Sequence, residues 1–212
     1  MCMSSNGKTV GSESKMLLIF IISVHIIFIA QAQRAGIKGG FNVSKLYANE
    51  VANENNFYGF NVGIYTQVLQ SRALALQLEL LYTTKGTKAD NEASPQSAKY
   101  NLSYLELPVL AAIRLGGAGE VHVGAYASYL LNAKIAYSSI LPNGFTKITD
   151  TDLKSFDYGL IAGLGVNVGN AQVGVRYNLG LASIANTNNA VLILGSSRII
   201  SASIYVSLSL FR

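Results

Sequence analysis

Apolar residues alternate with small or polar residues along eight stretches of the chain, which predicts eight β-strands, each with one apolar face. The clearest stretch runs from Phe156 to Val168, where seven apolar side chains share one face and Asp157, Asn167 and three glycines share the other. Most stretches are close to the 9 to 11 residues with which a tilted strand crosses a membrane. The predicted strands are residues 35–43, 58–68, 74–82, 101–113, 121–131, 156–168, 173–179 and 200–210.

The connections between the predicted strands alternate between short and long without exception. The short turns are residues 69–73, 116–120 and 169–171, and the long, polar connections are residues 47–57, 83–100, 132–155 and 180–199. Eight antiparallel strands then place every short turn at one end and every long loop at the other, as in barrels with periplasmic turns and extracellular loops. The pattern predicts an all-β fold, an eight-stranded antiparallel up-and-down transmembrane β-barrel.

A soluble up-and-down barrel of the lipocalin type is the alternative, because its strands alternate in the same way. Two features of the polar face favour a membrane barrel whose apolar face points outward. Glycines crowd the polar face, as expected where eight strands close tightly, and charged residues occupy mid-strand positions on it, where they can pair across a narrow lumen. These charged residues are Lys38, Glu79, Glu106 and Arg176.

Residues 1–32 are predicted to be a secretory signal peptide that precedes a barrel domain at residues 33–212. An apolar run at residues 16–30 follows Lys8 and Lys15, and it ends at Ala30-Gln31-Ala32, which has the small-x-small form of a cleavage site. A single membrane anchor is the alternative, but this run of 15 residues is shorter than the about 20 that a spanning helix needs. Translation could start at Met1 or at Met16.

Composition excludes several classes of site. The chain has one cysteine, Cys2, which the predicted cleavage removes, so the mature protein has no disulfide, no thiolate metal site and no cysteine nucleophile. The formal net charge is +5, but only 13% of residues are charged and the basic ones are scattered. This distribution is not that of a nucleic-acid-binding protein.

Five motifs resemble the PorT-like outer-membrane β-barrel family, also described as an outer-membrane protein β-barrel domain. They are GIKGGFN at residues 36–42, ELLYTTKG at 79–86, YLELP at 104–108, DYGL at 157–160 and VRYNLGL at 175–181. The resemblance covers nearly all of residues 34–211 and implies an outer-membrane barrel. The group that gives the family its name is implicated in secretion or assembly at the cell surface, but the shared residues are mostly those that the barrel itself requires.

The lumen is predicted to be filled by a polar network. An eight-stranded barrel is just wide enough for its own side chains, and buried charges must be paired. We expect Glu106 to pair with Lys38 or Arg176, and tyrosine hydroxyls to satisfy the remaining groups. The predicted network consists of Lys38, Glu79, Tyr104, Glu106, Tyr126 and Arg176.

Catalytic and metal sites are weakly supported. The mature chain has one histidine, His122, next to a short turn, and we interpret it as a hydrogen-bonding residue at the periplasmic rim of the lumen rather than as a catalytic residue. Asp150 and Asp152 with Asn143 lack the ligand spacing of a calcium loop, so a solvated loop is the simpler interpretation.

The sequence thus predicts a monomeric, non-enzymatic, multi-pass protein of a Gram-negative outer membrane, without a cofactor and with a structural or cell-surface interaction role. The alternatives are a small-ligand or lipid-binding barrel, or an accessory factor in secretion or surface assembly. The expected partners are outer-membrane lipid, the barrel insertion machinery and a surface or secretion partner, and no nucleic acid.

Overall fold

The computed structural model describes residues 34–47, 54–91, 96–137, 155–182 and 198–211. All of them belong to one of the two compact units of the chain, Gln33–Arg212. The predicted signal peptide lies outside the described residues. No helix in the described part of the chain is long and apolar enough to span a membrane.

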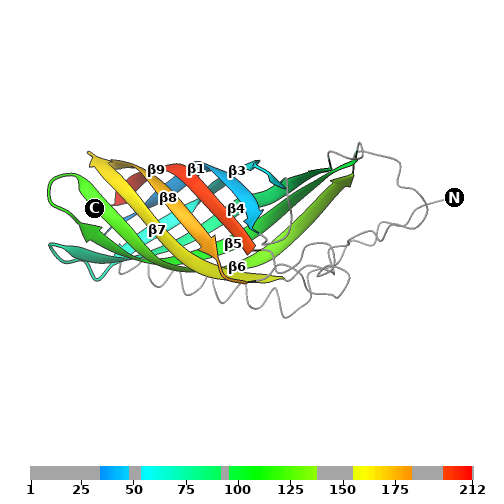
Figure 1. Cartoon of the computed structure of the whole chain (residues 1–212). Helices are drawn as coiled ribbons and strands as arrows, with labels where there is room; N and C mark the ends of the chain where they lie inside the picture. Colours follow the sequence, from blue (N-terminus) through cyan, green and yellow to red (C-terminus); the bar gives the residue numbers. More distant parts are fainter. Residues whose placement is uncertain (1–33, 48–53, 92–95, 138–154, 183–197, 212) are drawn as a thin grey trace. The chain divides into compact units, whose positions relative to one another are not determined.

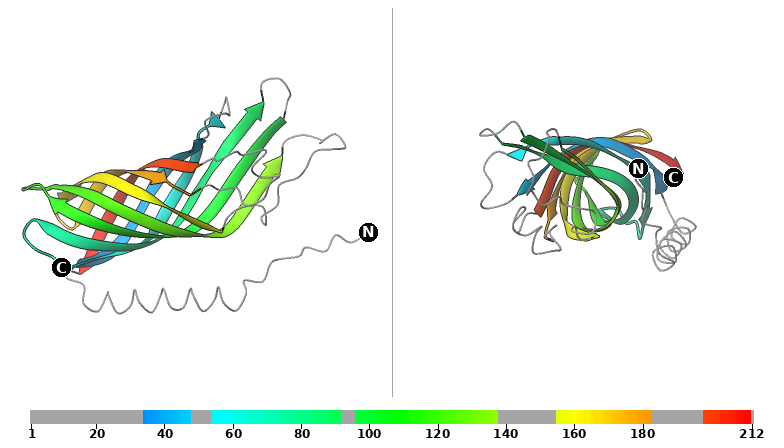
Figure 2. Two further views of the ribbon diagram at one scale, coloured as in Figure 1. Left: turned by 60° about the horizontal axis from the view of Figure 1, so that its bottom comes forward. Right: turned by 90° about the vertical axis from the view of Figure 1, so that its right-hand side faces the viewer.

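Eight long strands form one antiparallel sheet, and they are β1 (Arg34–Tyr47), β3 (Phe57–Val68), β4 (Leu74–Asn91), β5 (Gln96–Arg114), β6 (Gly119–Tyr137), β7 (Phe156–Val168), β8 (Ala171–Gly180) and β9 (Arg198–Phe211). Their order in the sheet is β4-β3-β1-β9-β8-β7-β6-β5, and the pairing of β4 with β5 closes the sheet into a barrel (Figure 1). The end-on view in Figure 2 shows the closed wall. This confirms the predicted eight-stranded antiparallel barrel. A further strand of two residues, β2 (Glu54–Asn55), pairs with β4.

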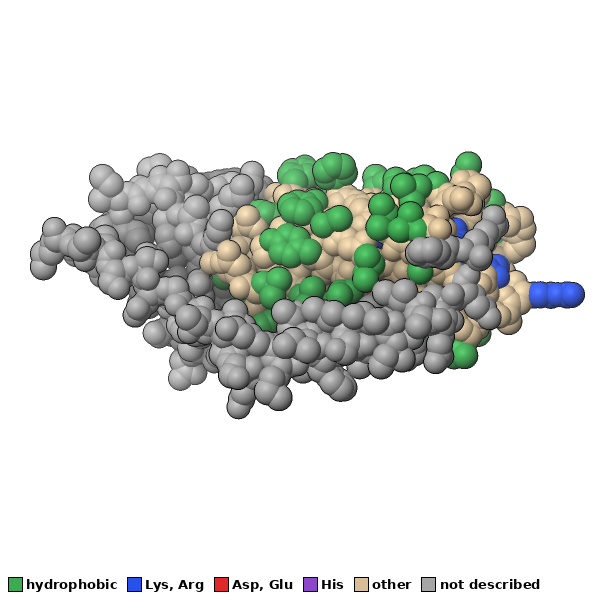
Figure 3. All heavy atoms as spheres, turned by 180° about the vertical axis from the view of Figure 1, so that it is seen from behind, with side chains coloured by type: hydrophobic (Ala, Val, Ile, Leu, Met, Phe, Trp, Pro, Cys, Tyr) green, Lys and Arg blue, Asp and Glu red, His purple; other side chains and the backbone are tan. Residues whose placement is uncertain are grey.

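Apolar side chains cover the outside of the barrel, as Figure 3 shows for one side of it. Leu164 on β7 is 56% exposed, Ile204 on β9 is 63% exposed and Phe41 on β1 is 80% exposed. The residues that alternate with them are buried, and many are polar or charged. This is the inverse of a lipocalin-type barrel, so the structure decides between the two barrel types that the sequence left open.

Strands β4, β5 and β6 have 18, 19 and 19 residues, and they reach beyond the other strands at one end of the barrel (Figure 2). The prediction of a long loop at residues 83–100 is therefore wrong, because β4 and β5 stay paired up to Asn91 opposite Gln96. The sequence hid this extension because its residues are polar on both faces. A segment without alternating apolar positions gives no period-two signal of a strand.

The other long connections agree with the prediction in part. The predicted loop at residues 47–57 contains the two-residue strand β2, which pairs with Lys88 and Ala89 of β4. Strand β6 runs six residues into the predicted loop at residues 132–155, as far as Tyr137. Most of this loop, including Asn143, Asp150 and Asp152, lies outside the described residues, as do residues 183–197.

Glycines make room for tyrosines that point into the lumen. Tyr205 on β9 lies opposite Gly174 on β8, and a methyl group added at Gly174 would be 2.5 Å from the tyrosine hydroxyl. Tyr126 lies opposite Gly159 in the same way, at 2.7 Å from such a methyl group. A ring that covers the glycine of a neighbouring strand fills a narrow interior without displacing the wall.

Candidate functional site: the polar lumen

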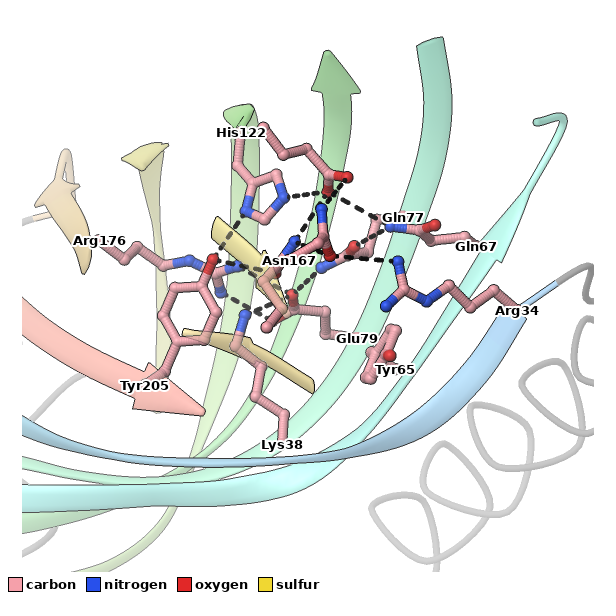
Figure 4. A network of polar contacts seen from close by, with 12 residues as sticks. Arg34, Lys38, Tyr65, Gln67, Gln77, Glu79, His122, Asn167, Arg176 and Tyr205 are labelled. Atoms are coloured by element: carbon pink, nitrogen blue, oxygen red, sulfur yellow. Dashed lines mark hydrogen bonds and ion pairs between the residues drawn. The ribbon is translucent and has the colours of Figure 1, made fainter. Parts of the chain in front are cut away.

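The centre of the lumen holds one carboxylate between two cations, which we call the Glu79 cluster (Lys38, Glu79 and Arg176). Arg176 donates from Nη1 to Glu79 Oε2 at 2.7 Å and from Nη2 to Oε1 at 2.8 Å, and Lys38 Nζ donates to Oε1 at 2.9 Å (Figure 4). The side chain of Glu79 is fully buried. The bidentate arginine and the second cation together compensate the negative charge of a carboxylate that is buried away from water.

Hydrogen bonds continue from the Glu79 cluster toward the end of the barrel that carries the short turns. Gln77 donates to Glu79, Gln67 donates to Gln77 at 2.8 Å, and the same Gln67 amide lies 3.4 Å from Glu120 Oε1. These side chains come from β3, β4 and β6, and their bonds tie three parts of the wall together.

His122 lies in this part of the lumen and is fully buried. Its Nε2 lies 2.6 Å from Glu120 Oε1 and its Nδ1 lies 3.2 Å from the hydroxyl of Tyr205. The Tyr205 ring is also close to both cations of the Glu79 cluster, with Lys38 Nζ 3.7 Å from the ring centroid. Burial and these partners give His122 a structural environment without access for a substrate.

Glu106 pairs with Lys85, which we call the Glu106 pair, and also accepts a hydrogen bond from Asn178 Nδ2 at 3.3 Å. The expectation that Glu106 pairs with Lys38 or Arg176 is therefore wrong, since both of these cations bind Glu79. Lys85 falls in the long connection that the sequence predicts at residues 83–100. In the structure it belongs to β4 and has the same parity as Glu79, so the longer strand turns it into the lumen.

The two predicted tyrosines lie around the Glu106 pair. Lys85 Nζ is 4.5 Å from the ring centroid of Tyr126 and 5.9 Å from that of Tyr104, distances at which a cation is attracted to an aromatic face. The Tyr126 hydroxyl donates to Asp157 Oδ2 at 3.1 Å. Asp157 is the second residue of β7, so this contact lies at the opposite end of the lumen from His122.

All six residues of the predicted network lie buried inside the barrel, but they fall into two groups. Lys38, Glu79 and Arg176 form one group, and Glu106 lies near Tyr104 and Tyr126 in the other. Sequence reasoning missed several members of the network. The parity of the strands could have found four of them, because Gln77, Lys85, Glu120 and Gln172 each lie an even number of positions from a predicted lumen residue on their own strand, whereas β3 and β9 contribute no residue to the predicted network. The missed residues are Gln67, Gln77, Lys85, Glu120, Gln172 and Tyr205.

A cavity of about 10 Å³ lies within the lumen. Its walls include charged residues of both groups, among them Lys38, Arg176, Lys85 and Glu106. A cavity of this size is just large enough to hold one water molecule. Charged side chains of both groups therefore approach one small space in the described part of the lumen.

A family model described as an outer membrane protein β-barrel domain matches residues 29–186. The chain belongs to this family. The closed barrel, its apolar outer surface and the family together identify an outer-membrane protein that crosses the bilayer with its strands. No curated protein sequence matches the chain significantly.

Several solved outer-membrane proteins are similar to the chain at low identity. Ail, the attachment invasion locus protein of Yersinia pestis, is 11% identical, with a TM-score of 0.46 over 84% of this chain and 99% of Ail. Neisserial surface protein A is 15% identical, with a TM-score of 0.48 over 82% and 96% of the two chains. OprG of Pseudomonas aeruginosa is 13% identical, with a TM-score of 0.43 over 84% and 94%. Likenesses at these values carry no information about a shared function.

Proposed function

We propose that this protein is a sealed, monomeric, non-enzymatic barrel that works through contacts at the cell surface, with its lumen serving as a plug. The observation that supports this most directly is the Glu79 cluster, where three fully or nearly fully buried charges from β1, β4 and β8 meet across the interior. Charges that are paired across a narrow barrel hold opposite walls together. The cavity beside them has room for one water molecule, which opposes a role in solute transport.

Recordings across planar lipid bilayers test the plug. The refolded parent protein is expected to give no conductance steps. Glu79→Ala is expected to raise leak conductance, because Lys38 and Arg176 would then repel each other without a carboxylate between them. Ile204→Ala removes only outward-facing atoms and is the matched control. Stable steps from the parent protein would contradict the plug and favour an open channel.

The part of the barrel available for a surface partner is the extension of β4, β5 and β6 beyond the other strands. Membrane-embedded segments contact lipid, and the short turns are only two to five residues long between the strands that they join. The paired β4–β5 extension instead offers an ordered sheet on the long-loop side. We therefore place the contact with a partner there.

The resemblance to PorT-like proteins raises a second possibility, an accessory role in secretion with a partner on the periplasmic side. Photo-crosslinking in intact cells separates the two. A crosslinker at Ser97, in the β4–β5 extension, is expected to capture a partner, and one at Gly117, in the opposite turn, is not. Capture from Gly117 alone would contradict the cell-surface proposal and favour the accessory role.

A further inference from the structure

The hydrogen bonds of the lumen form two networks that stop just short of each other. The first runs from Glu120 through Gln67 and Gln77 to the Glu79 cluster and ends at Arg176. The second consists of the Glu106 pair and Asn178, whose Nδ2 donates to Glu106. Arg176 and Asn178 are two positions apart on β8, so both face the lumen at adjacent levels.

Four buried polar atoms at this interruption have no hydrogen-bond partner among the described residues. They belong to β1, β4 and β8 and are Asn42 Oδ1, Thr83 Oγ1, Arg176 Nε and Asn178 Oδ1. Each of these side chains is at least nine-tenths buried. All four residues line the cavity of about 10 Å³, so the unpaired groups surround one space.

The chemistry of the four atoms matches one ligand. Arginine Nε can only donate, the two amide oxygens can only accept, and a threonine hydroxyl can do either. The orientation of the Asn178 amide is determined by the bond from its Nδ2 to Glu106, so its oxygen must be the atom that faces the cavity. A water molecule donates two hydrogen bonds and accepts two, which satisfies this set completely, and the volume suits one water.

An ion fits the same space less well. Lys38, Lys85 and Arg176 line it, so a cation would meet three positive charges that are balanced by only two carboxylates, Glu79 and Glu106. An anion would meet the amide oxygens of Asn42 and Asn178, which repel it. Leaving four buried groups without partners would destabilise the fold, because each group loses the hydrogen bonds that it makes with water in the unfolded chain.

We propose that the lumen contains a binding site for a single water molecule, held by Asn42, Thr83, Arg176 and Asn178. The water accepts from Arg176 Nε and donates to the oxygens of Asn42 and Asn178, while the Thr83 hydroxyl donates to it. It joins the Glu79 cluster to the Glu106 pair, so one hydrogen-bonded network runs from Glu120 to Lys85. The bound water would be a structural ligand of the proposed plug, but the inference itself rests only on the geometry of the cavity.

Nuclear magnetic resonance of the refolded, isotope-labelled barrel tests the site through the Nε–H proton of Arg176. This proton is expected to show a cross-peak at the water frequency, with opposite signs in the laboratory and rotating frames, as for a long-lived bound water. Chemical exchange gives the same sign in both frames. Arg34 is the matched control, because its Nε donates to Ser209 Oγ at 2.6 Å and is expected to show no such cross-peak.

Two variants and two titrations complete the test. Asn178→Leu removes an acceptor and is expected to abolish the cross-peak, and Thr83→Val, which keeps the volume, is expected to weaken it, so the test survives if the first variant fails to fold.

The absence of the cross-peak in a folded parent protein would overturn the site. A saturable shift of the Arg176 signal with bromide, or with sodium against choline, would also overturn it in favour of an ion. A non-conducting barrel without bound water would refute this inference alone, whereas a conducting barrel would refute the plug.

Discussion

Glu79 is the residue on which the centre of the lumen depends most, because it is the shared partner of two buried cations. Glu79→Ala is expected to lower the free energy of unfolding by about 3 to 5 kcal/mol, the usual cost of breaking a buried ion pair. Because the chain has no tryptophan, unfolding in urea is best followed by circular dichroism or by gel mobility. Glu106→Ala leaves only Lys85 without its carboxylate and should cost less. Equal stability of the Glu79→Ala variant and the parent would show that the cluster contributes nothing to the fold.

Gly174 tests how tightly the interior is packed. Gly174→Ala would place a methyl group against the Tyr205 ring and the backbone of β7, and we expect it to destabilise the barrel by about 1 to 3 kcal/mol through overpacking. Gly39→Ala is the matched control on β1, since a methyl group there would have only the Asn61 carbonyl oxygen near it, at 3.7 Å. The same urea titration measures both variants. Similar stabilities would mean that the lumen has more free space than the contacts indicate.

At the scale of the element, β7 shows how the two faces of a strand differ. Leu164→Arg places a charge on its outward face within the membrane and is expected to lower the free energy of folding into vesicles by about 2 to 4 kcal/mol. Val168→Arg, at the end of the same strand, should cost only about 0 to 1 kcal/mol, because the charge lies near the interface. Equal effects of the two substitutions would contradict the placement of β7 in the bilayer.

At the scale of the whole molecule, closure of the sheet determines resistance to detergent. Pairing of β4 with β5 leaves the barrel wall without a free edge over the membrane-spanning strands, so its hydrogen bonds are inaccessible to competing partners. The folded protein is expected to migrate faster in an unheated gel than after boiling. An identical mobility before and after boiling would contradict a stable closed barrel. The Leu164→Arg variant should show less of the fast form.

The alternation along the strands, with the alternation of short and long connections, determined the eight-stranded antiparallel barrel. Period-two positions such as those of β7 identify a strand and the residues that share each of its faces. Which face points outward was decided by the tertiary structure, because a soluble barrel has the same period. The ends of β4, β5 and β6 were not predicted because their sequences lack this regular alternation.

Strand parity likewise placed Lys38, Glu79, Glu106 and Arg176 in the lumen, but it did not determine which of them meet. Pairing depends on the stagger of strands that are distant in the chain, as when Arg176 of β8 reaches Glu79 of β4 across the interior. It also depends on Lys85, which enters the lumen only because β4 extends beyond the stretch of residues that alternate between apolar and polar. Local periodicity is a property of one strand, whereas the pairing of charges across a barrel depends on the register of all eight strands. Only the tertiary structure determines that register.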